Sequence, residues 1–214
     1  MRVFFAVSAR LVVVQWRAAM ARLFFAVGVS RDVAAALRSI SLGLGRAPIA
    51  DCLRLIDVEQ AHFTLRFLGE QSAERQEAAL RAGRAAARGA SPFDLEFERL
   101  GVFPDERRPH TLWIGAGKGA PELAGLAAML ENELAVEGFL REGRPFVPHL
   151  TLARVKRRPE RSKMATLLAA LPTQIAPLRV EGFALMESRP ERGTVRYVAL
   201  ENFAMELPCT PSKS

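Results

Sequence analysis

The chain has 214 residues, half of them hydrophobic and a quarter charged, which is typical of a globular protein that buries one core. Its two cysteines, Cys52 and Cys209, are far apart and lie in no metal-binding spacing, which argues against a disulfide framework and a zinc site and favours a cytoplasmic protein. The net charge of +7 suits an anionic partner, although 26 of the 30 basic residues are arginine and a general compositional bias explains the charge equally well.

The first 19 residues resemble an addition to the domain. The stretch Val3–Val7 is nearly repeated at Leu23–Val27, and Met20 precedes the second copy. We interpret residues 1–19 as an N-terminal extension, with Met20 as the original start. A secretory signal and an additional strand are the alternatives, and arginines within and just after the apolar run disfavour the signal.

The remaining chain contains no low-complexity linker. We therefore expect a single domain over residues 20–207, followed by a flexible tail at 208–214. No other apolar run approaches the length of a membrane-spanning helix, so we expect no membrane partner.

The first half of the domain begins with an apolar, aromatic-rich segment that predicts a buried strand. Ser30 is a suitable N-cap for the helix that follows, and Ser72 for a second one rich in alanine, glutamate and arginine. The expected elements are a strand at 22–29, a helix from 30 to about 43, a short strand at 53–56 and a helix at 71–89.

The second half continues with alternating and helical patterns. We expect a half-exposed strand at 93–98, a turn at 101–104, a strand at 111–115, helices at 121–138 and 159–171, and two long strands at 178–188 and 194–207 joined by a hairpin. This order of elements predicts an α+β fold of two similar lobes with mostly antiparallel sheets and helices on the outside.

A repeated tetrapeptide is the most informative feature of the chain. Only three histidines are present, and two of them begin the same pattern, as His62-Phe63-Thr64-Leu65 and His149-Leu150-Thr151-Leu152. His110 is followed by threonine at the next position and does not fit. Such a repeat is far more frequent than the composition of the chain predicts, so we expect a chemical role for it.

Both motifs lie in apolar alternating segments that predict strands. Residues i and i+2 of a strand share a face, so the histidine and threonine of each motif point the same way. In the first motif Phe63, Leu65 and Phe67 are then expected to point into the core, and each motif presents one imidazole and one hydroxyl.

Two imidazoles can act as a base and an acid at neutral pH, as required for the displacement of one oxygen by another at a phosphodiester. Two hydroxyls can hydrogen-bond the other phosphate oxygens. Carboxylates with metal-ligand spacing do not accompany the histidines, so we expect neither a metal nor another cofactor.

The segments His62–Glu70 and Pro148–Arg154 resemble the paired His-x-Thr-x motifs of the two-histidine (2H) phosphoesterase superfamily. Within it, the chain is similar to the RNA 2′,3′-cyclic phosphodiesterases, historically called 2′-5′ RNA ligases. The similarity runs from about Met20 to Leu207 and includes Arg22–Ala26 and Gly101–Pro104.

The resemblance implies a bilobal fold with a central cleft to which each lobe contributes one motif. It implies that His62 donates a proton to the leaving ribose oxygen, that His149 activates water, and that Thr64 and Thr151 hold the phosphate. Arg154 matches a phosphate-binding arginine of the family. As the third residue after Thr151 it has the wrong strand parity, and it needs a bulge or the strand end to reach the cleft.

Other side chains near the motifs have less specific interpretations. The basic run from Arg154 to Lys163 is suited to RNA backbone, although a solvated helix start is the simpler interpretation. Phe103 and Phe146 are candidates for stacking a base, with core or turn packing as the alternative.

The expected partner is RNA or a nucleotide with a 2′,3′-cyclic phosphate, which a monomeric enzyme hydrolyses to a 2′-phosphomonoester without a metal. RNA 2′-5′ ligation and a non-catalytic RNA- or nucleotide-binding module with the same cleft are the alternatives. Intact histidines in both motifs disfavour a pure binder. A metal-binding protein is a third class, and it lacks further ligands at a recognisable spacing.

Overall fold

The computed structural model describes residues 20–170, 175–191 and 194–206, so the expected extension at 1–19 and tail at 208–214 lie outside the described residues. Within them the helices are α1 (Arg31–Gly45), α2 (Ala73–Gly89), α3 (Ala120–Val136) and α4 (Arg161–Ala170), with short 3-10 turns η1 (Ala50–Cys52) and η2 (Val58–Gln60). None of these helices is both long and apolar enough to cross a membrane.

The strands lie close to their expected positions. They are β1 (Ala21–Gly28), β2 (Leu53–Leu55), β3 (His62–Gln71), β4 (Phe93–Leu95), β5 (Phe97–Phe103), β6 (Thr111–Ala116), β7 (His149–Val155), β8 (Leu178–Val180), β9 (Gly182–Glu191) and β10 (Thr194–Ala204).

Most strands form one sheet in the order β10-β9-β1-β3-β7-β6-β5, with β2 paired alongside β7, while β4 and β8 form a separate two-stranded sheet. The pairs of neighbouring strands are antiparallel throughout. The predicted α+β class with mostly antiparallel sheets is therefore confirmed.

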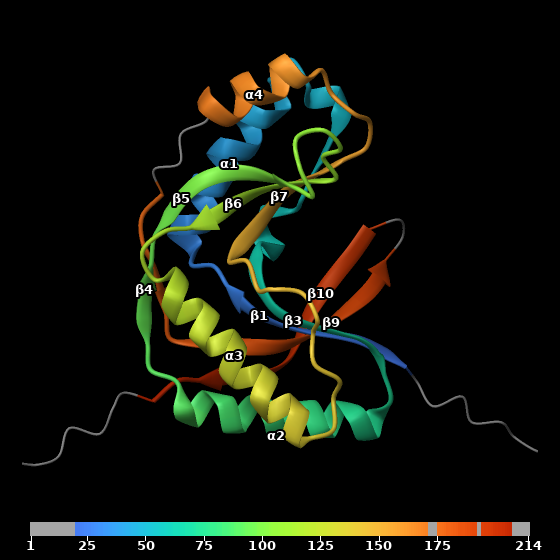
Figure 1. Ribbon diagram of the computed structural model, residues 1–214, viewed down its shortest axis with the longest axis vertical. Coiled ribbons are helices and arrows are strands. Elements are labelled where there is room, and N and C mark those ends of the chain that lie inside the picture. The colour runs from blue at the N-terminus through green and yellow to red at the C-terminus, as the bar shows by residue number, and fades with distance from the viewer. Residues whose placement is uncertain (1–19, 171–174, 192–193, 207–214) are drawn as a thin grey trace, which may run out of the picture.

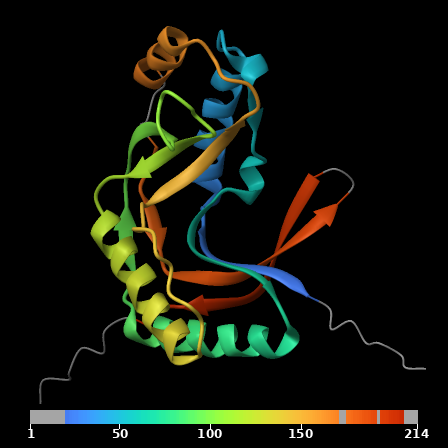
Figure 2. The same cartoon turned by 45° about the vertical axis from the view of Figure 1, so that its right-hand side comes forward.

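The molecule has two halves that meet at the motif strands (Figures 1 and 2). In the first-motif half, α2 and α3 cover one face of the strands β1, β3, β9 and β10. The second-motif half contains β2, β5, β6 and β7, with α1 and α4 at its outer end. The halves are joined in the sheet by the pairing of Phe63 in β3 with Leu150 in β7.

Two of the helices begin where the sequence predicts. The hydroxyl of Ser30 accepts a hydrogen bond from the backbone N–H of Val33, and that of Ser72 accepts one from Arg75. Each serine thereby satisfies one of the N–H groups that the first helical turn leaves without an intrahelical partner.

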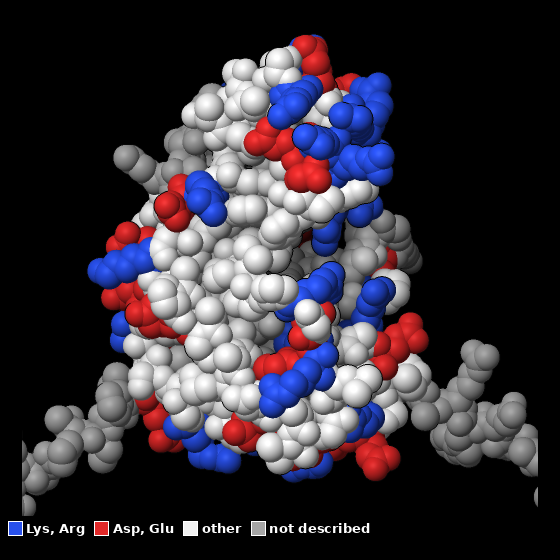
Figure 3. Space-filling model, in the orientation of Figure 1, with Lys and Arg blue, Asp and Glu red and all other residues white. Residues whose placement is uncertain are grey.

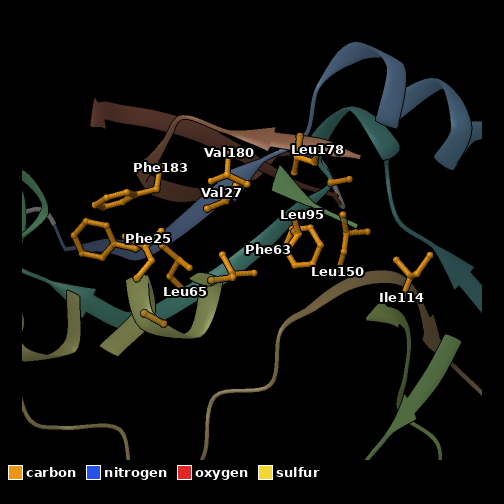
Figure 4. Packing of buried hydrophobic residues seen from close by; sticks show 14 of the residues in the cluster. Phe25, Val27, Phe63, Leu65, Leu95, Ile114, Leu150, Leu178, Val180 and Phe183 are labelled. Atoms are coloured by element: carbon orange, nitrogen blue, oxygen red, sulfur yellow. The ribbon is translucent and has the colours of Figure 1, made fainter. Parts of the chain in front are cut away.

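A continuous hydrophobic core extends behind both halves (Figure 4). It contains buried side chains from β1, β3, β6, β7, β8 and β9, among them Phe25, Val27, Phe63, Leu65, Ile114, Leu150, Val180 and Phe183. Truncation of a buried side chain of this kind costs about 2–5 kcal/mol of stability. The two motif strands therefore share one tightly packed backing.

Two of the expected strands are divided. The strand predicted at 93–98 breaks at Glu96, whose N–H donates to the carbonyl of Lys118, and the strand predicted at 178–188 breaks at Glu181, whose carbonyl accepts from Met205. At each break the chain passes between the small sheet and the large one. Burial continues through the first break, since Leu95 and Phe97 are both buried, so a hydrophobicity pattern does not reveal it.

The turn predicted at 101–104 is a strand end. Residues 101–103 belong to β5, and the chain leaves the strand at the cis peptide bond between Phe103 and Pro104. Gly101 is paired with Trp113 on β6, and a Cβ atom at this position would lie 2.3 Å from the indole ring. Glycine is therefore required there because Trp113 packs across the strand.

The prediction that Phe67 points into the core is wrong, because this side chain is 58% exposed. The register between β1 and β3 shifts at Leu65 and again at Leu68, each an extra residue in β3, and the first shift reverses the alternation beyond Leu65. Arg66 consequently donates to Glu131 of α3 at 2.8 Å, and the ring of Phe67 lies 5.8 Å from that of Phe24 on the opposite face.

Candidate active site

The pairing of the motif strands brings the four predicted histidine and threonine residues together. Strands β3 and β7 are antiparallel, with Phe63 opposite Leu150. Extending this register by one residue in each direction places His62 across from Thr151 and Thr64 across from His149. Because residues on either side of a buried pair share the opposite face, the two imidazoles and two hydroxyls lie on one face.

The residues between them provide the apolar backing that the alternation predicts. Phe63 and Leu65 of β3 and Leu150 and Leu152 of β7 are all at least 95% buried. Figure 4 shows Phe63, Leu65 and Leu150 within the packed core. The site therefore rests on rigid strands and depends little on loops.

The two imidazoles are oriented by the same hydrogen bond. The Nδ1 atom of His62 lies 2.7 Å from the carbonyl oxygen of Gln60, and that of His149 lies 2.8 Å from the carbonyl oxygen of Val147. A carbonyl oxygen can only accept, so in both rings Nδ1 carries the hydrogen. The Nε2 atom of each ring is left to exchange a proton with a bound molecule.

Aromatic rings surround each imidazole. The centroid of the His62 ring lies 5.1 Å from that of Phe24 and 5.1 Å from that of Tyr197, which it meets edge-on. The centroid of the His149 ring lies 4.7 Å from that of Phe103 and 6.2 Å from that of Trp113, both in edge-on contacts. These contacts restrict rotation of the imidazoles and exclude water from one side of each ring.

The surroundings lower the pKa of both histidines. Burial lowers the pKa of His62, the Gln60 carbonyl opposes this, and the charge of His149 lowers the pKa further. Burial also lowers the pKa of His149, the Val147 carbonyl opposes it, and the guanidinium of Arg154 lowers the pKa further. Both rings therefore favour the neutral form more than an exposed histidine does.

Arg154 is three residues beyond Thr151 and would lie on the other face of a regular strand. A bulge in β7 brings it to the face of the site. Ala153 is paired with Leu112 and Thr151 with Trp113, so Leu152 is an extra residue in β7. The side chain of Arg154 donates a hydrogen bond of 2.6 Å to the hydroxyl of Thr111, which is buried and directly opposite on β6. Its guanidinium lowers the pKa of His149, and Trp113, two residues along β6 from Thr111, borders that histidine.

Several residues of the site were not identified from the sequence. The side chain of Gln60 accepts a 2.7 Å hydrogen bond from the N–H of Tyr197, which ties β10 to the segment that precedes His62. Phe24, Tyr197 and Thr111 belong to strands whose contacts with the motifs depend on the order of the sheet. For Phe24, the only signal in the sequence was its place in the segment Arg22–Ala26, which resembles the family.

The other side chains singled out in the sequence have different surroundings. His110 is exposed at the start of β6, where its backbone carbonyl accepts from Val155. Phe146 is half-buried against the core, whereas Phe103 lies against His149. In the basic run, Arg157 is paired with Asp51 and Lys163 with Glu160.

A pocket of about 500 Å³ continues the site beside His62. It lies between the start of α1, the turn η2 and the strands β9 and β10, and its wall includes Ala26, Gln60, His62, Tyr197 and Asn202. Figure 3 shows a hollow between the two halves, with Lys and Arg side chains at its border. In the part of the chain that the structure describes, no three or more histidine, cysteine or acidic side chains cluster as metal ligands.

Comparisons with known proteins agree with this geometry. A model of the 2′-5′ RNA ligase superfamily matches residues 31–192. An RNA 2′,3′-cyclic phosphodiesterase of Thermus thermophilus is 33% identical over 192 residues, covering 86% of this chain and 90% of that protein. The Escherichia coli RNA 2′,3′-cyclic phosphodiesterase is 33% identical over 153 residues, covering 71% of this chain and 80% of that protein.

Solved structures show the same architecture. E. coli LigT complexed with 3′-AMP superposes with a TM-score of 0.71 at 30% identity, covering 87% of this chain and 99% of that one. The T. thermophilus protein TT0787 has a TM-score of 0.71 at 28% identity, covering 86% of this chain and 97% of that one. With a superfamily match over most of its length and these relatives, the chain belongs to the 2′-5′ RNA ligase superfamily of two-histidine phosphoesterases.

Proposed function

We propose that this protein hydrolyses 2′,3′-cyclic phosphate ends of RNA to 2′-phosphomonoesters by metal-independent acid–base catalysis at His62 and His149. The observation that carries the proposal is the pair of imidazoles on adjacent strands, each held through Nδ1 by a backbone carbonyl. The relatives named RNA 2′,3′-cyclic phosphodiesterase support the choice of substrate.

The proposed reaction needs one neutral and one protonated histidine. Neutral His149 removes a proton from water through Nε2, and the water oxygen forms a bond to phosphorus. The bond between phosphorus and the ribose 3′ oxygen breaks, and protonated His62 donates its Nε2 proton to that oxygen. The product has a 2′-phosphate and a 3′-hydroxyl, and proton exchange with solvent restores the starting forms.

The polar groups beside the histidines stabilise the charge that develops on phosphate. The hydroxyls of Thr64 and Thr151 lie on the same face and donate hydrogen bonds to the non-bridging oxygens. Arg154, held by Thr111, supplies a positive charge at the His149 side. That charge favours neutral His149, which agrees with its assignment as the base.

The test is to incubate the purified protein with an RNA that ends in a 2′,3′-cyclic phosphate, before and after exhaustive treatment with EDTA. We expect a gain of 18 Da in mass and a product whose terminal phosphate is removed by a phosphatase. Loss of activity after EDTA that returns with zinc, manganese or magnesium would contradict the metal-independent mechanism.

The same reaction with a 5′-hydroxyl in place of water would form a 2′-5′ linkage. Addition of a second RNA with a 5′-hydroxyl distinguishes the two outcomes, because ligation gives a longer product. A protein that binds the RNA end and leaves it unchanged would instead be the non-catalytic module.

A further inference from the structure

A row of three polar side chains crosses the second-motif half. Arg154 on β7 is directly opposite Thr111 on β6 and directly opposite Arg54 on β2. Residues directly opposite in neighbouring strands project from the same face. Thr111 and Trp113 are two residues apart on β6 and therefore share a face of the sheet. Because Trp113 borders His149, the row lies on the face that carries the site.

The two arginines of this row form an unfavourable pair. Like charges directly opposite on neighbouring strands destabilise a sheet. Among the residues that the structure describes, neither Arg54 nor Arg154 has a carboxylate within ion-pair distance. Arg157, two residues beyond β7, is paired with Asp51. The row therefore has the charge arrangement of a site that a bound anion completes.

The position of Arg54 separates it from the proposed reaction centre. Arg154 is three residues beyond Thr151, which corresponds to roughly 7–10 Å of strand when the bulge is included. Arg54 lies one strand further from Thr111 and is exposed, and the buried Leu53 beside it faces the core. Because Arg54 is directly opposite Arg154, it lies at a similar distance from Thr151 along the strand direction, which is enough to separate two neighbouring phosphates of one nucleic-acid strand.

We propose that Arg54 binds the phosphodiester that joins the terminal nucleotide of the RNA to the preceding one. This inference rests on the proposed function and adds to it a second phosphate subsite that favours RNA ends over free cyclic nucleotides. A guanidinium donates two parallel hydrogen bonds to a phosphate, so a single arginine suffices for such a contact.

The test compares two substrates, a free 2′,3′-cyclic nucleotide and a dinucleotide that ends in a 2′,3′-cyclic phosphate. Only the dinucleotide has the second phosphate. We expect Arg54→Met to lower kcat/KM for the dinucleotide on the order of tenfold and to change it less than about twofold for the mononucleotide. Methionine retains an apolar stem without the charge.

The salt dependence provides an independent readout. With an RNA oligonucleotide as the ligand, loss of one phosphate contact reduces the slope of log affinity against log salt concentration by about 0.7. Arg88→Met is the matched control, since Arg88 is exposed in the last turn of α2, and α2 packs on the opposite face of the sheet. This control is expected to leave both substrates and the salt slope unchanged.

An equal loss on both substrates, or no loss on either, would overturn the subsite. If wild-type protein hydrolyses neither substrate, the proposed function fails, and the subsite is still tested by fluorescence anisotropy with an RNA oligonucleotide that ends in a 2′-phosphate. Unchanged affinity and salt slope for Arg54→Met in that measurement would rule out the contact. Circular dichroism melting curves establish that each variant is folded.

Discussion

The two halves of the molecule present the same parts in different electrostatic surroundings. Each contributes a histidine, a threonine two residues later, and a backbone carbonyl two residues earlier that accepts from Nδ1. Each also surrounds the imidazole with two aromatic rings, Phe24 and Tyr197 in one half and their counterparts from β5 and β6 in the other. The repeated motif thus corresponds to a repeated local geometry.

The halves differ in charge and solvent contact. His62 is the more buried of the two histidines, and a largely apolar pocket continues beyond it. His149 has Arg154 nearby, and Arg54 follows in the same row of the sheet. The bulge at Leu152 brings Arg154 to the face of the site, whereas the bulges in β3 turn Arg66 away toward α3.

From this difference we expect unequal tasks for two motifs of the same local geometry. A cation beside His149 disfavours the protonated ring and attracts phosphate. His62 is largely buried and borders an apolar pocket. Such a pocket is suited to the less charged part of a ligand.

The largest expected effect comes from removing either imidazole. His62→Ala and His149→Ala are each expected to lower kcat on the order of 10²–10⁴-fold, because each loses one half of a coupled proton transfer. The double variant is expected to be little slower than either single variant, since residues that act as a unit are not additive. Steady-state kinetics measure all three.

His110→Ala is the matched control, because His110 lies outside the site, and its activity is expected to equal that of the wild type. Circular dichroism establishes folding. A folded His149→Ala protein with wild-type turnover would end the two-histidine mechanism.

The second prediction concerns the cation that distinguishes the halves. In the proposed mechanism the active form carries one proton on two histidines, so kcat/KM is expected to follow a bell-shaped pH profile. Since burial lowers the pKa of both rings, the maximum is expected below about pH 6.5, the ordinary pKa of histidine. Arg154→Met removes a positive charge that lowers the pKa of His149, so the profile is expected to move to higher pH while the maximal kcat/KM falls about 10–100-fold.

Arg154→Lys restores the charge without the fork geometry. Its pH profile is expected to return toward that of the wild type, although activity is only partly recovered. If the pH profile of Arg154→Met does not move, the charge of Arg154 does not affect the pKa of His149 in the free enzyme.

The third prediction tests the equivalence of the hydroxyls. Thr64→Val and Thr151→Val remove a hydrogen-bond donor and keep the shape of the side chain. Each is expected to cost about 1–3 kcal/mol of transition-state stabilisation, as for a hydrogen bond to a charged group. Similar values of kcat/KM for the two variants would support symmetrical contacts with the phosphate, and an effect confined to one of them would assign the phosphate contact to that motif.

The smallest expected effect is that of Thr111→Val. The hydroxyl of Thr111 accepts from Arg154, and its loss leaves the arginine in place but less well held. We expect the change to cost about 1 kcal/mol of transition-state stabilisation, measured through kcat/KM. The pH profile is expected to stay nearly unchanged, because the charge near His149 remains. A loss as large as that of Arg154→Met would mean that Thr111 contacts the substrate itself.

The sequence by itself determined the parts of the site and their local arrangement. A period of two places His62 and Thr64 on one face of a strand and Phe63 on the other, and the same holds for His149, Thr151 and Leu150. Helix starts at Ser30 and Ser72 follow from local hydrogen bonding, which depends on a few neighbouring residues. These features involve contacts within about four residues, so a linear pattern contains them.

The tertiary structure alone decided which strands are neighbours and where their register shifts. The alternation that predicts a buried Phe67 fails because β3 bulges against β1, and the division of the strand at 93–98 depends on pairing with β8, more than eighty residues away. Arg154 shares the face of His149 only because of the bulge opposite β6, and Arg54 joins it only because β2 pairs with β7. Pairing and bulges arise from contacts between distant segments, so hydrophobic periodicity leaves them undetermined.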